Sequence, residues 1–210
     1  MGSQPWHGAS IVALDLEGSG AQDHDTEAIL EVALVPLADG QPTLDQAFTS
    51  LVNPRRPIPR RAWISPGLTN DVLAQAPSLE QITDTLTQLI DGRWLLGHNI
   101  HVDWRLLRRH LPDLRPAGLI DTLALARSLD YRNRSLSALA EQLGLTAAIQ
   151  QAARDGQPHR ALWDTVATAY LLPKLVAQRW PHGPPTFDSL RRAAGIPLTT
   201  EASEQPALFD

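Results

Sequence analysis

The amino-acid sequence predicts an α/β domain with a mixed β-sheet. Apolar runs of strand length, joined by short polar connections, come first in the 210-residue chain. Later strand-length segments alternate with segments whose apolar residues recur with a helical period. Strands that follow one another through short turns pair antiparallel, and strands separated by helices pair parallel. The order therefore favours a mixed sheet flanked by helices.

Five strands are expected, at residues 11–16, 28–37, 46–52, 94–97 and 118–122. The first is an apolar run that stops at the turn-forming Gly18-Ser19-Gly20. Because the connections between the first three are short and polar, these three should form an antiparallel meander. The last two are compact apolar segments in the helical part of the chain.

Helices are expected from residue 69 or 70, from 78, and over 100–110, 122–129, 135–143, 161–178 and 187–194. Ser78 with Glu80-Gln81 just inside the helix is typical of a capping box. Residues 53–59 hold three prolines and form a loop, since each proline removes a backbone donor. Four arginines accompany this loop, Arg55, Arg56, Arg60 and Arg61. They either contact phosphates or are simply solvated, and solvation is the favoured interpretation.

Composition places the chain among ordinary globular domains. It is 43% hydrophobic and 20% charged, without a signal peptide or an apolar run that could span a membrane, which predicts a cytoplasmic protein. The absence of cysteine excludes disulfides, thiolate metal sites and a cysteine nucleophile. The net charge of −5 argues against a nucleic-acid partner. An acidic metal centre would weaken that argument, because bound cations reverse the local sign.

Asp15 and Glu17 stand at the end of the first strand. Side chains two residues apart on a strand point the same way, so these carboxylates should project together. Two such groups repel unless a proton or cation lies between them. They form either a site for hard divalent ions or an acidic strand end in water, and the pair alone leaves both interpretations open.

Three later residues favour the metal site. Asp103 lies on the first turn of its expected helix, on the face that should pack on the sheet. Asp164 likewise shares a face with core residues of the helix 161–178. His159 precedes Asp164 by five residues, about 140° apart on a helix. The two converge only if His159 lies in the loop before the helix, and Pro158 favours that placement.

These residues occur in three motifs that resemble those of the DnaQ-like 3′–5′ exonucleases, the DEDDh branch of the ribonuclease-H-like fold. The motifs are Asp15-Leu16-Glu17, Gly97-His98-Asn99-Ile100-His101-Val102-Asp103 and His159-Arg160-Ala161-Leu162-Trp163-Asp164. The resemblance covers about residues 10–178. It implies a three-layer fold with a mixed five-stranded sheet. It divides the chain into an exonuclease domain (1–180), a short extension (181–197) and a flexible tail (198–210).

The resemblance also implies the roles of the five residues. Asp15 would bridge two Mg²⁺ or Mn²⁺ ions, Glu17 and Asp164 would complete one site, and Asp103 would hold the second ion, partly through water. Two such ions can hold the attacking water, the scissile phosphate and the leaving oxygen together. His159 would be the general base, since a histidine side chain titrates near neutral pH.

Four residues beside these motifs are candidates for binding the substrate end. Leu16 and Gly18 stand where family members usually carry threonine, and Leu16 could still wedge against the terminal base. His98 and Asn99 border the second motif, where Asn99 either caps the following helix or contacts substrate; the cap is favoured. Pro66-Gly67-Leu68-Thr69 replaces the His-Gly-Ile-Thr of many relatives.

The chain ends in Gln205-Pro206-Ala207-Leu208-Phe209, which resembles the motif by which bacterial polymerases and repair proteins bind the sliding clamp. Gln205 would supply a polar anchor, and Leu208 and Phe209 would enter an apolar pocket. Tethering would raise the local concentration of the enzyme at DNA.

The resulting expectation is a metal-dependent 3′–5′ exonuclease that releases nucleoside monophosphates from single-stranded DNA 3′ ends, in proofreading or clamp-linked repair. A replicative polymerase subunit is a further candidate partner. Two alternatives stay open: an exoribonuclease of the same branch, and a catalytically silent scaffold that binds nucleic acid. The presence of all five catalytic residues argues against the scaffold.

Overall fold

A computed structural model describes residues 4–20, 27–62, 64–154 and 156–198 of the chain. The strands are β1 (Ile11–Gly18), β2 (Ile29–Ala38), β3 (Gln41–Pro42), β4 (Phe48–Leu51), β5 (Trp94–Gly97), β6 (Gly118–Asp121) and β7 (Gly195–Ile196). The α-helices are α1 (Asn70–Ala74), α2 (Leu79–Ile90), α3 (His101–His110), α4 (Thr122–Arg127), α5 (Leu136–Gln142), α6 (Thr146–Ala152), α7 (Ala161–Arg179) and α8 (Phe187–Ala194). The described residues also form two short 3₁₀ helices, η1 (Trp6–Gly8) and η3 (Leu44–Gln46).

The strands form one mixed sheet in the order β3-β2-β1-β5-β6-β7, with β4 also paired to β2. β1 runs antiparallel to β2 and parallel to β5, and β5 runs parallel to β6. The expected meander and the mixed sheet are confirmed. Among the described residues the sheet has seven strands rather than five, because the two-residue strands β3 and β7 were not predicted.

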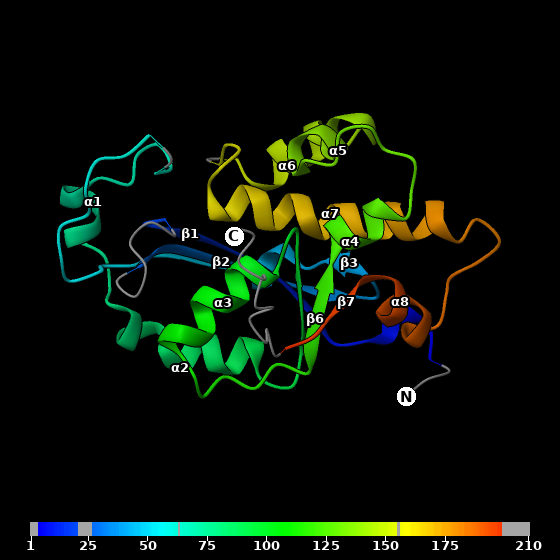
Figure 1. The fold of residues 1–210 in the computed structure, drawn as a ribbon, viewed down its shortest axis with the longest axis horizontal. Helices are drawn as coiled ribbons and strands as arrows, with labels where there is room; N and C mark the ends of the chain where they lie inside the picture. The colour runs from blue at the N-terminus through cyan, green and yellow to red at the C-terminus, as the bar shows by residue number, and fades with distance from the viewer. Residues whose placement is uncertain (1–3, 21–26, 63, 155, 199–210) are drawn as a thin grey trace, which may run out of the picture.

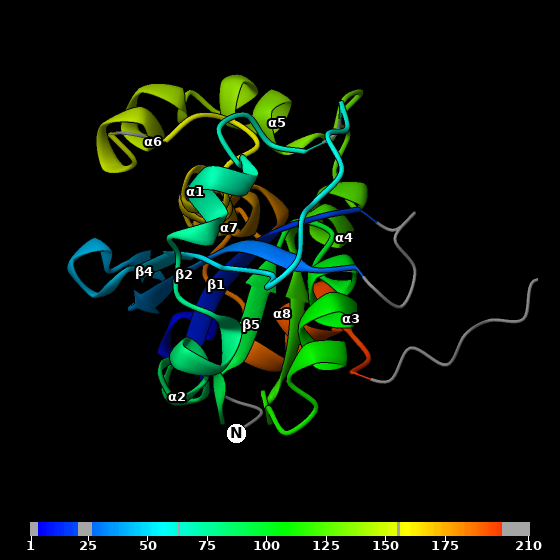
Figure 2. The same cartoon turned by 90° about the vertical axis from the view of Figure 1, so that its left-hand side faces the viewer.

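Helices cover both faces of the sheet, which gives three layers (Figures 1 and 2). On one face the core joins β1 to α4, α5, α6, α7 and α8, and α7 lies between the sheet and the α5–α6 pair. On the other face the core joins β1 to α2 and α3. α1 and the loop before it stand away from both layers, held by a small third cluster that includes Ile58, Leu68 and Leu73.

Local sequence signals explain where several helices begin. Ser78 and Gln81 form the expected capping box at the start of α2. Thr69 caps α1 and Ser135 caps α5, each accepting a backbone hydrogen bond from the first turn. The helix α6 was not predicted. Its start at Leu145 has no side-chain cap, and it packs through the buried Ile149.

The expected extension, residues 181–197, contains α8 and β7. The helix α8 buries Phe187, Leu190 and Ala194 in the larger core, and β7 pairs antiparallel with β6. The tail with the expected clamp motif lies outside the described residues. In the described ranges, no helix combines the length and the apolar character needed to cross a membrane.

Candidate active site

The pleat of β1 directs Asp15 and Glu17 toward α7. Ile11 and Ala13 belong to the core on the α7 face, whereas Val12 and Leu14 belong to the core on the α3 face. Because side chains alternate along a strand, Asp15 and Glu17 continue the α7-facing row beyond the core. Both are only partly buried, at the end of the strand where the core gives way to solvent.

Asp164 meets these two carboxylates from the first turn of α7. One carboxylate oxygen from each of Asp15, Glu17 and Asp164 lies within 4.8 Å of the other two. A strand end and a helix start, which are about 150 residues apart in the chain, thus place three oxygen ligands around one point. Three such oxygens are the donor set that Mg²⁺ and Mn²⁺ prefer.

Asp103 reaches the same strand end from the opposite face of the sheet. It lies on the first turn of α3, and its Oδ1 accepts a hydrogen bond of 3.0 Å from the backbone N–H of Leu16. Its charge raises the pKa of Asp15, an effect second only to burial. The four acids expected from the sequence therefore gather at one place.

The electrostatics of the cluster are those of crowded, partly buried acids. Burial, followed by the neighbouring carboxylates, raises the pKa of Asp15 well above its ordinary value. Burial also raises the pKa values of Glu17, Asp103 and Asp164, each to about 7. Hydrogen bonds from Ser65 to Glu17, from Leu16 to Asp103, and from the backbone of His159 to Asp164 oppose these rises. At neutral pH the cluster needs shared protons or bound cations.

His159 lies in the loop before α7, where the sequence required it to be. α7 begins at Ala161, and His159 is exposed with a left-handed backbone, φ 66°. The charge of His159 lowers the pKa of Glu17, so the imidazole lies within electrostatic range of the acids. Its exposed position leaves the ring open to an incoming substrate.

Two residues of the site, Ser65 and Glu31, were missed by the sequence analysis, which also assigned no role to Arg160 within the third motif. Ser65 donates a hydrogen bond of 2.5 Å to Glu17 Oε2. Glu31 stands opposite Glu17 in the β1–β2 register and forms an ion pair with Arg160. No local pattern identified Ser65, which follows a proline-rich loop. For Glu31 a signal was present, because it is an acid inside an apolar strand.

Leu16 and Gly18, two of the residues expected to bind the substrate end, differ in their packing. Leu16 packs partly against the apolar core on the α3 face. Gly18 lies at an irregularity in the β1–β2 register, where an added Cβ would lie 3.1 Å from Leu106 Cδ2. Both remain at the rim of the acidic cluster.

His98 and Asn99 both have hydrogen-bond partners within the protein. The ring nitrogens of His98 lie 2.8 Å from Thr122 Oγ1 and 2.8 Å from the carbonyl of Arg134, so both are engaged within the protein. The expectation that Asn99 caps α3 is wrong: the N-cap position is Ile100, without a side-chain cap. The left-handed backbone of Asn99, φ 74°, directs its N–H to Asp121 Oδ1 at 2.8 Å, which is incompatible with the extended backbone typical of a cap.

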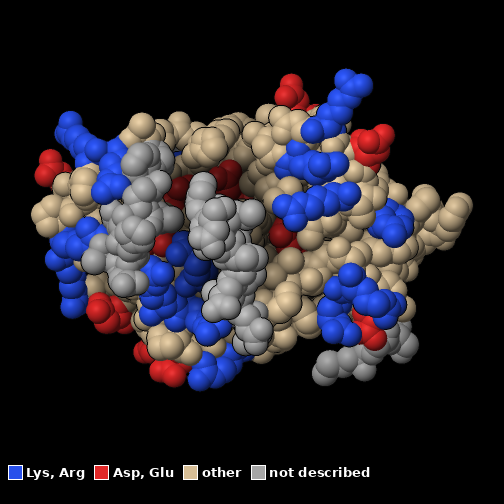
Figure 3. Space-filling model, viewed as in Figure 1, with Lys and Arg blue, Asp and Glu red and all other residues tan. Residues whose placement is uncertain are grey.

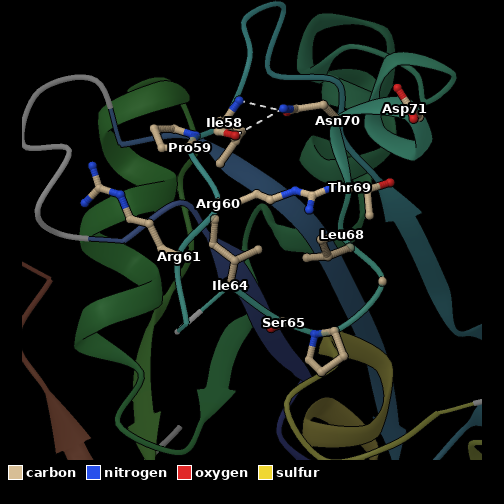
Figure 4. Close-up of a pocket in the computed structure, with 12 residues that line it drawn as sticks. Ile58, Pro59, Arg60, Arg61, Ile64, Ser65, Leu68, Thr69, Asn70 and Asp71 are labelled. Carbon is tan, nitrogen blue, oxygen red and sulfur yellow. Dashed lines mark hydrogen bonds between the residues drawn. The ribbon is translucent and has the colours of Figure 1, made fainter.

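The loop between β4 and α1 forms a cavity of about 430 Å³ next to the cluster. Figure 4 shows Arg60 extended across it toward Thr69, while Arg61 points away. Ser65 lines the same cavity and contacts Glu17, so the cavity wall and the acids are joined. In Figure 3, acidic side chains lie deep beside the start of α7, between surfaces that carry basic side chains.

Comparison with known proteins identifies the family. The family model described as Exonuclease, RNase_T, matches residues 12–172, which include all four acids and His159. The chain belongs to this exonuclease family. The DnaQ-like, ribonuclease-H-like assignment expected from the sequence is thereby confirmed, together with its α/β fold.

Relatives of this exonuclease domain include longer proteins. It is 30% identical to the DNA polymerase III subunit epsilon-like protein of Rhodobacter capsulatus over 86% of this chain and 26% of that protein. It is 27% identical to the 3′-5′ exonuclease DinG of Bacillus subtilis over 87% of this chain and 19% of that protein. The chain thus spans about a quarter or less of these curated relatives.

Solved structures agree with the family assignment. Exonuclease X in complex with 5′ overhanging duplex DNA matches with a TM-score of 0.60 and 27% identity, over 86% of this chain and 98% of that one. The nuclease domain of 3′hExo, a DEDDh family member bound to rAMP, matches with a TM-score of 0.56 over 80% and 92%. At 17% identity, the second likeness concerns the fold alone.

Proposed function

We propose that the chain is a metal-dependent 3′–5′ exonuclease that releases nucleoside monophosphates from single-stranded DNA ends. The observation that carries this proposal is the convergence of Asp15, Glu17 and Asp164, with Asp103 behind them and His159 exposed beside them. DNA is preferred over RNA as substrate because relatives above 25% identity include proteins named for DNA polymerase III and an exonuclease solved with duplex DNA.

The residues of the cluster fit divalent ions. They offer oxygen ligands only, and those of Asp15, Glu17 and Asp164 lie within 4.8 Å of one another. Burial, and after it the neighbouring carboxylates, raises the pKa values of these groups, so a bound cation would favour their charged forms. We assign Asp15, Glu17 and Asp164 to one Mg²⁺ or Mn²⁺ ion, and Asp15 with Asp103 to a second. Such ions, when bound, neutralise the charge that develops on the phosphate and on the leaving oxygen.

The protein's own residues would perform the remaining steps. His159 takes the proton from the attacking water at an imidazole nitrogen, and its place outside the helix leaves it free to close over a bound strand end. Ser65 fixes the orientation of the Glu17 carboxylate. Leu16 and Gly18 flank the acids, where the 3′-terminal nucleotide would lie.

The proposal is tested with single-stranded DNA and RNA of one sequence, labelled at the 5′ end, in Mg²⁺ or Mn²⁺. Stepwise shortening of the DNA with release of mononucleotides is expected. A phosphorothioate linkage at the 3′ end should block it, and one at the 5′ end should not. Asp15→Ala should abolish release with folding intact, while Asp113→Ala, a change at a fully exposed acid, should not.

Each other outcome contradicts part of the proposal. Faster cleavage of RNA would favour the exoribonuclease. Binding of DNA without cleavage would favour the silent scaffold. Undiminished release by Asp15→Ala would overturn the site.

We further propose that the tail binds a sliding clamp through Gln205, Leu208 and Phe209, and that the enzyme acts in proofreading or repair beside a polymerase. The sequence of the tail and the names of the polymerase III relatives support this. Deleting residues 205–209 should abolish capture by immobilised bacterial clamp and spare cleavage of free oligonucleotides. Capture that survives the deletion would refute the tail's role.

A further inference from the structure

A partly buried ion pair ties β2 to the residue next to His159. Arg160 donates from Nε to Glu31 Oε2 at 2.8 Å and from Nη2 to Oε1 at 2.9 Å. The Glu31 side chain is 6% exposed and that of Arg160 is 26% exposed. A two-pronged pair of this kind has one geometry, because the guanidinium is planar and both carboxylate oxygens are used.

Glu31 also holds the start of α7. Its Oε2 accepts a hydrogen bond of 3.3 Å from the backbone N–H of Ala161, the first residue of that helix. A carboxylate at this place satisfies a helix donor that otherwise has no partner and complements the helix dipole. Thr165, one turn later, donates its hydroxyl to the carbonyl of Ala161 at 2.7 Å, and the same oxygen lies 3.3 Å from the carbonyl of Ala33 on the same strand. The body of α7 also shares a buried apolar core with Val35 and Leu37 of β2, a contact that does not involve the Arg160 side chain.

His159 lies between two fixed points. On one side Arg160 is tied to Glu31; on the other the backbone of His159 bonds the Asp164 carboxylate. Its φ of 66° lies in the left-handed region, which residues other than glycine adopt uncommonly, although histidine does so more often than most. Without the Arg160 contact, the loop could relax toward commoner backbone angles and move the imidazole away from the acids.

We propose that Arg160 and Glu31 are positioning residues that hold His159 over the acidic cluster. This inference rests on the proposed function, in which His159 is the general base. Arg160 has a second role to consider. Its Nη1 lies beside Gly67, where an added Cβ would be 3.7 Å away, and Gly67 lines the cavity next to the acids. Direct contact between Arg160 and a substrate phosphate is the rival explanation.

A double-mutant cycle separates the two explanations. Arg160→Gln should lower kcat about 10- to 100-fold with KM little changed, since a displaced base slows the chemical step rather than binding. In a His159→Ala background the same substitution should change kcat less than about twofold, because the group it positions is gone. A phosphate contact would instead raise KM and keep its full effect in that background.

Conservative variants and a matched control sharpen the result. Arg160→Lys keeps the charge but loses the two-pronged geometry, so its kcat should lie between wild type and Arg160→Gln. Glu31→Gln should likewise lower kcat in the wild-type background and change it little in the His159→Ala background. Arg191→Gln, which removes an exposed pair with Asp188 on α8, should leave kcat unchanged.

The outcomes distinguish failure of the inference from failure of the proposed function. Full activity of His159→Ala, or inactive wild-type protein, would refute the proposed function. A much reduced but measurable kcat in His159→Ala, together with an unchanged kcat in Arg160→Gln, would refute the inference alone, and so would equal losses from Arg160→Gln in both backgrounds. The midpoint of thermal unfolding should be measured for each variant, so that a fall in kcat caused by unfolding is recognised. If Arg160→Gln unfolds, the cycle is carried out with Arg160→Lys in its place.

Discussion

The hydroxyl of Ser65 lies 2.5 Å from Glu17 Oε2 and donates a hydrogen bond to it, although 48 residues separate the two in the chain. Ser65 belongs to the wall of the cavity between β4 and α1, and Glu17 belongs to the acidic cluster at the end of β1. A nucleotide that rearranged the cavity wall would therefore act directly on a proposed metal ligand. The bond also favours the charged form of Glu17, since it lowers the pKa that burial raises.

Ser65→Ala should weaken the site without destroying it. Without the hydroxyl, the pKa of Glu17 should rise above about 7 and its carboxylate should lose a fixed orientation. We expect about 10-fold weaker apparent affinity for Mg²⁺ or Mn²⁺, a typical effect of losing a group that supports a metal ligand. Titration of exonuclease rate with metal measures this. Ser137→Ala, a control at an exposed position of α5, should keep the metal affinity of the wild type. Equal metal affinity in Ser65→Ala and Ser137→Ala would contradict the prediction.

Asp15→Asn should separate activity from stability. Asp15 suffers repulsion from Asp103, Asp164 and Glu17 in addition to burial, so an uncharged isostere relieves strain in metal-free protein. We expect the midpoint of metal-free thermal unfolding to rise by about 2 °C or more, given about 2–4 °C per kcal/mol in a protein of this size. Exonuclease activity should fall more than about 100-fold. A lower or unchanged midpoint would show that Asp15 is stabilised by its surroundings.

The stability of the metal-free protein should depend on pH through the same cluster. Glu17, Asp103 and Asp164 have pKa values of about 7 in the folded protein, against about 4 in an unfolded chain. Between these values the folded state holds more protons than the unfolded state, so these groups lower the free energy of unfolding as pH rises from about 4 to about 7.

Thermal unfolding at pH 5, 6, 7 and 8 with a chelator measures this effect. The destabilisation of wild type relative to a Glu17→Gln, Asp164→Asn variant should grow with pH and level off above about pH 7. Mg²⁺ or Mn²⁺ should raise the wild-type midpoint more at pH 8 than at pH 5, because carboxylates bind metal when deprotonated. A difference between the two proteins that stayed constant with pH would contradict the assignment.

His98→Ala should destabilise the fold rather than weaken substrate binding. Both ring nitrogens of His98 are hydrogen-bonded, and burial lowers its pKa, which favours the neutral ring. Loss of two hydrogen bonds should cost about 1–3 kcal/mol. Denaturant unfolding measures this, and KM for an oligonucleotide should stay within about twofold. A large rise in KM with unchanged stability would contradict this prediction and favour a substrate contact for His98.

Much of the fold follows from signals that lie close together in the chain. The run that forms β1, the cap and period of α2, and the position of His159 before α7 depend on neighbours within a few residues, and these predictions are confirmed. The order of the three motifs identified the family. The two-residue strands β3 and β7 were missed because each exists through pairing with a distant strand rather than through its own pattern.

The sequence by itself determined which residue types the site contains and at which element ends they stand, because strand and helix periods fix the direction of side chains locally. Only the tertiary structure decided which residues these groups contact. The path of the loop before α1 brings Ser65 to Glu17. The register of the sheet contributes to the contact between Glu31 and Arg160. The register sets Glu31 opposite Glu17, and packing of α7 on β2 then brings Arg160 to it. Asn99 shows the same limit: its local pattern suited a cap, but the bond from its backbone to Asp121 belongs to the folded sheet.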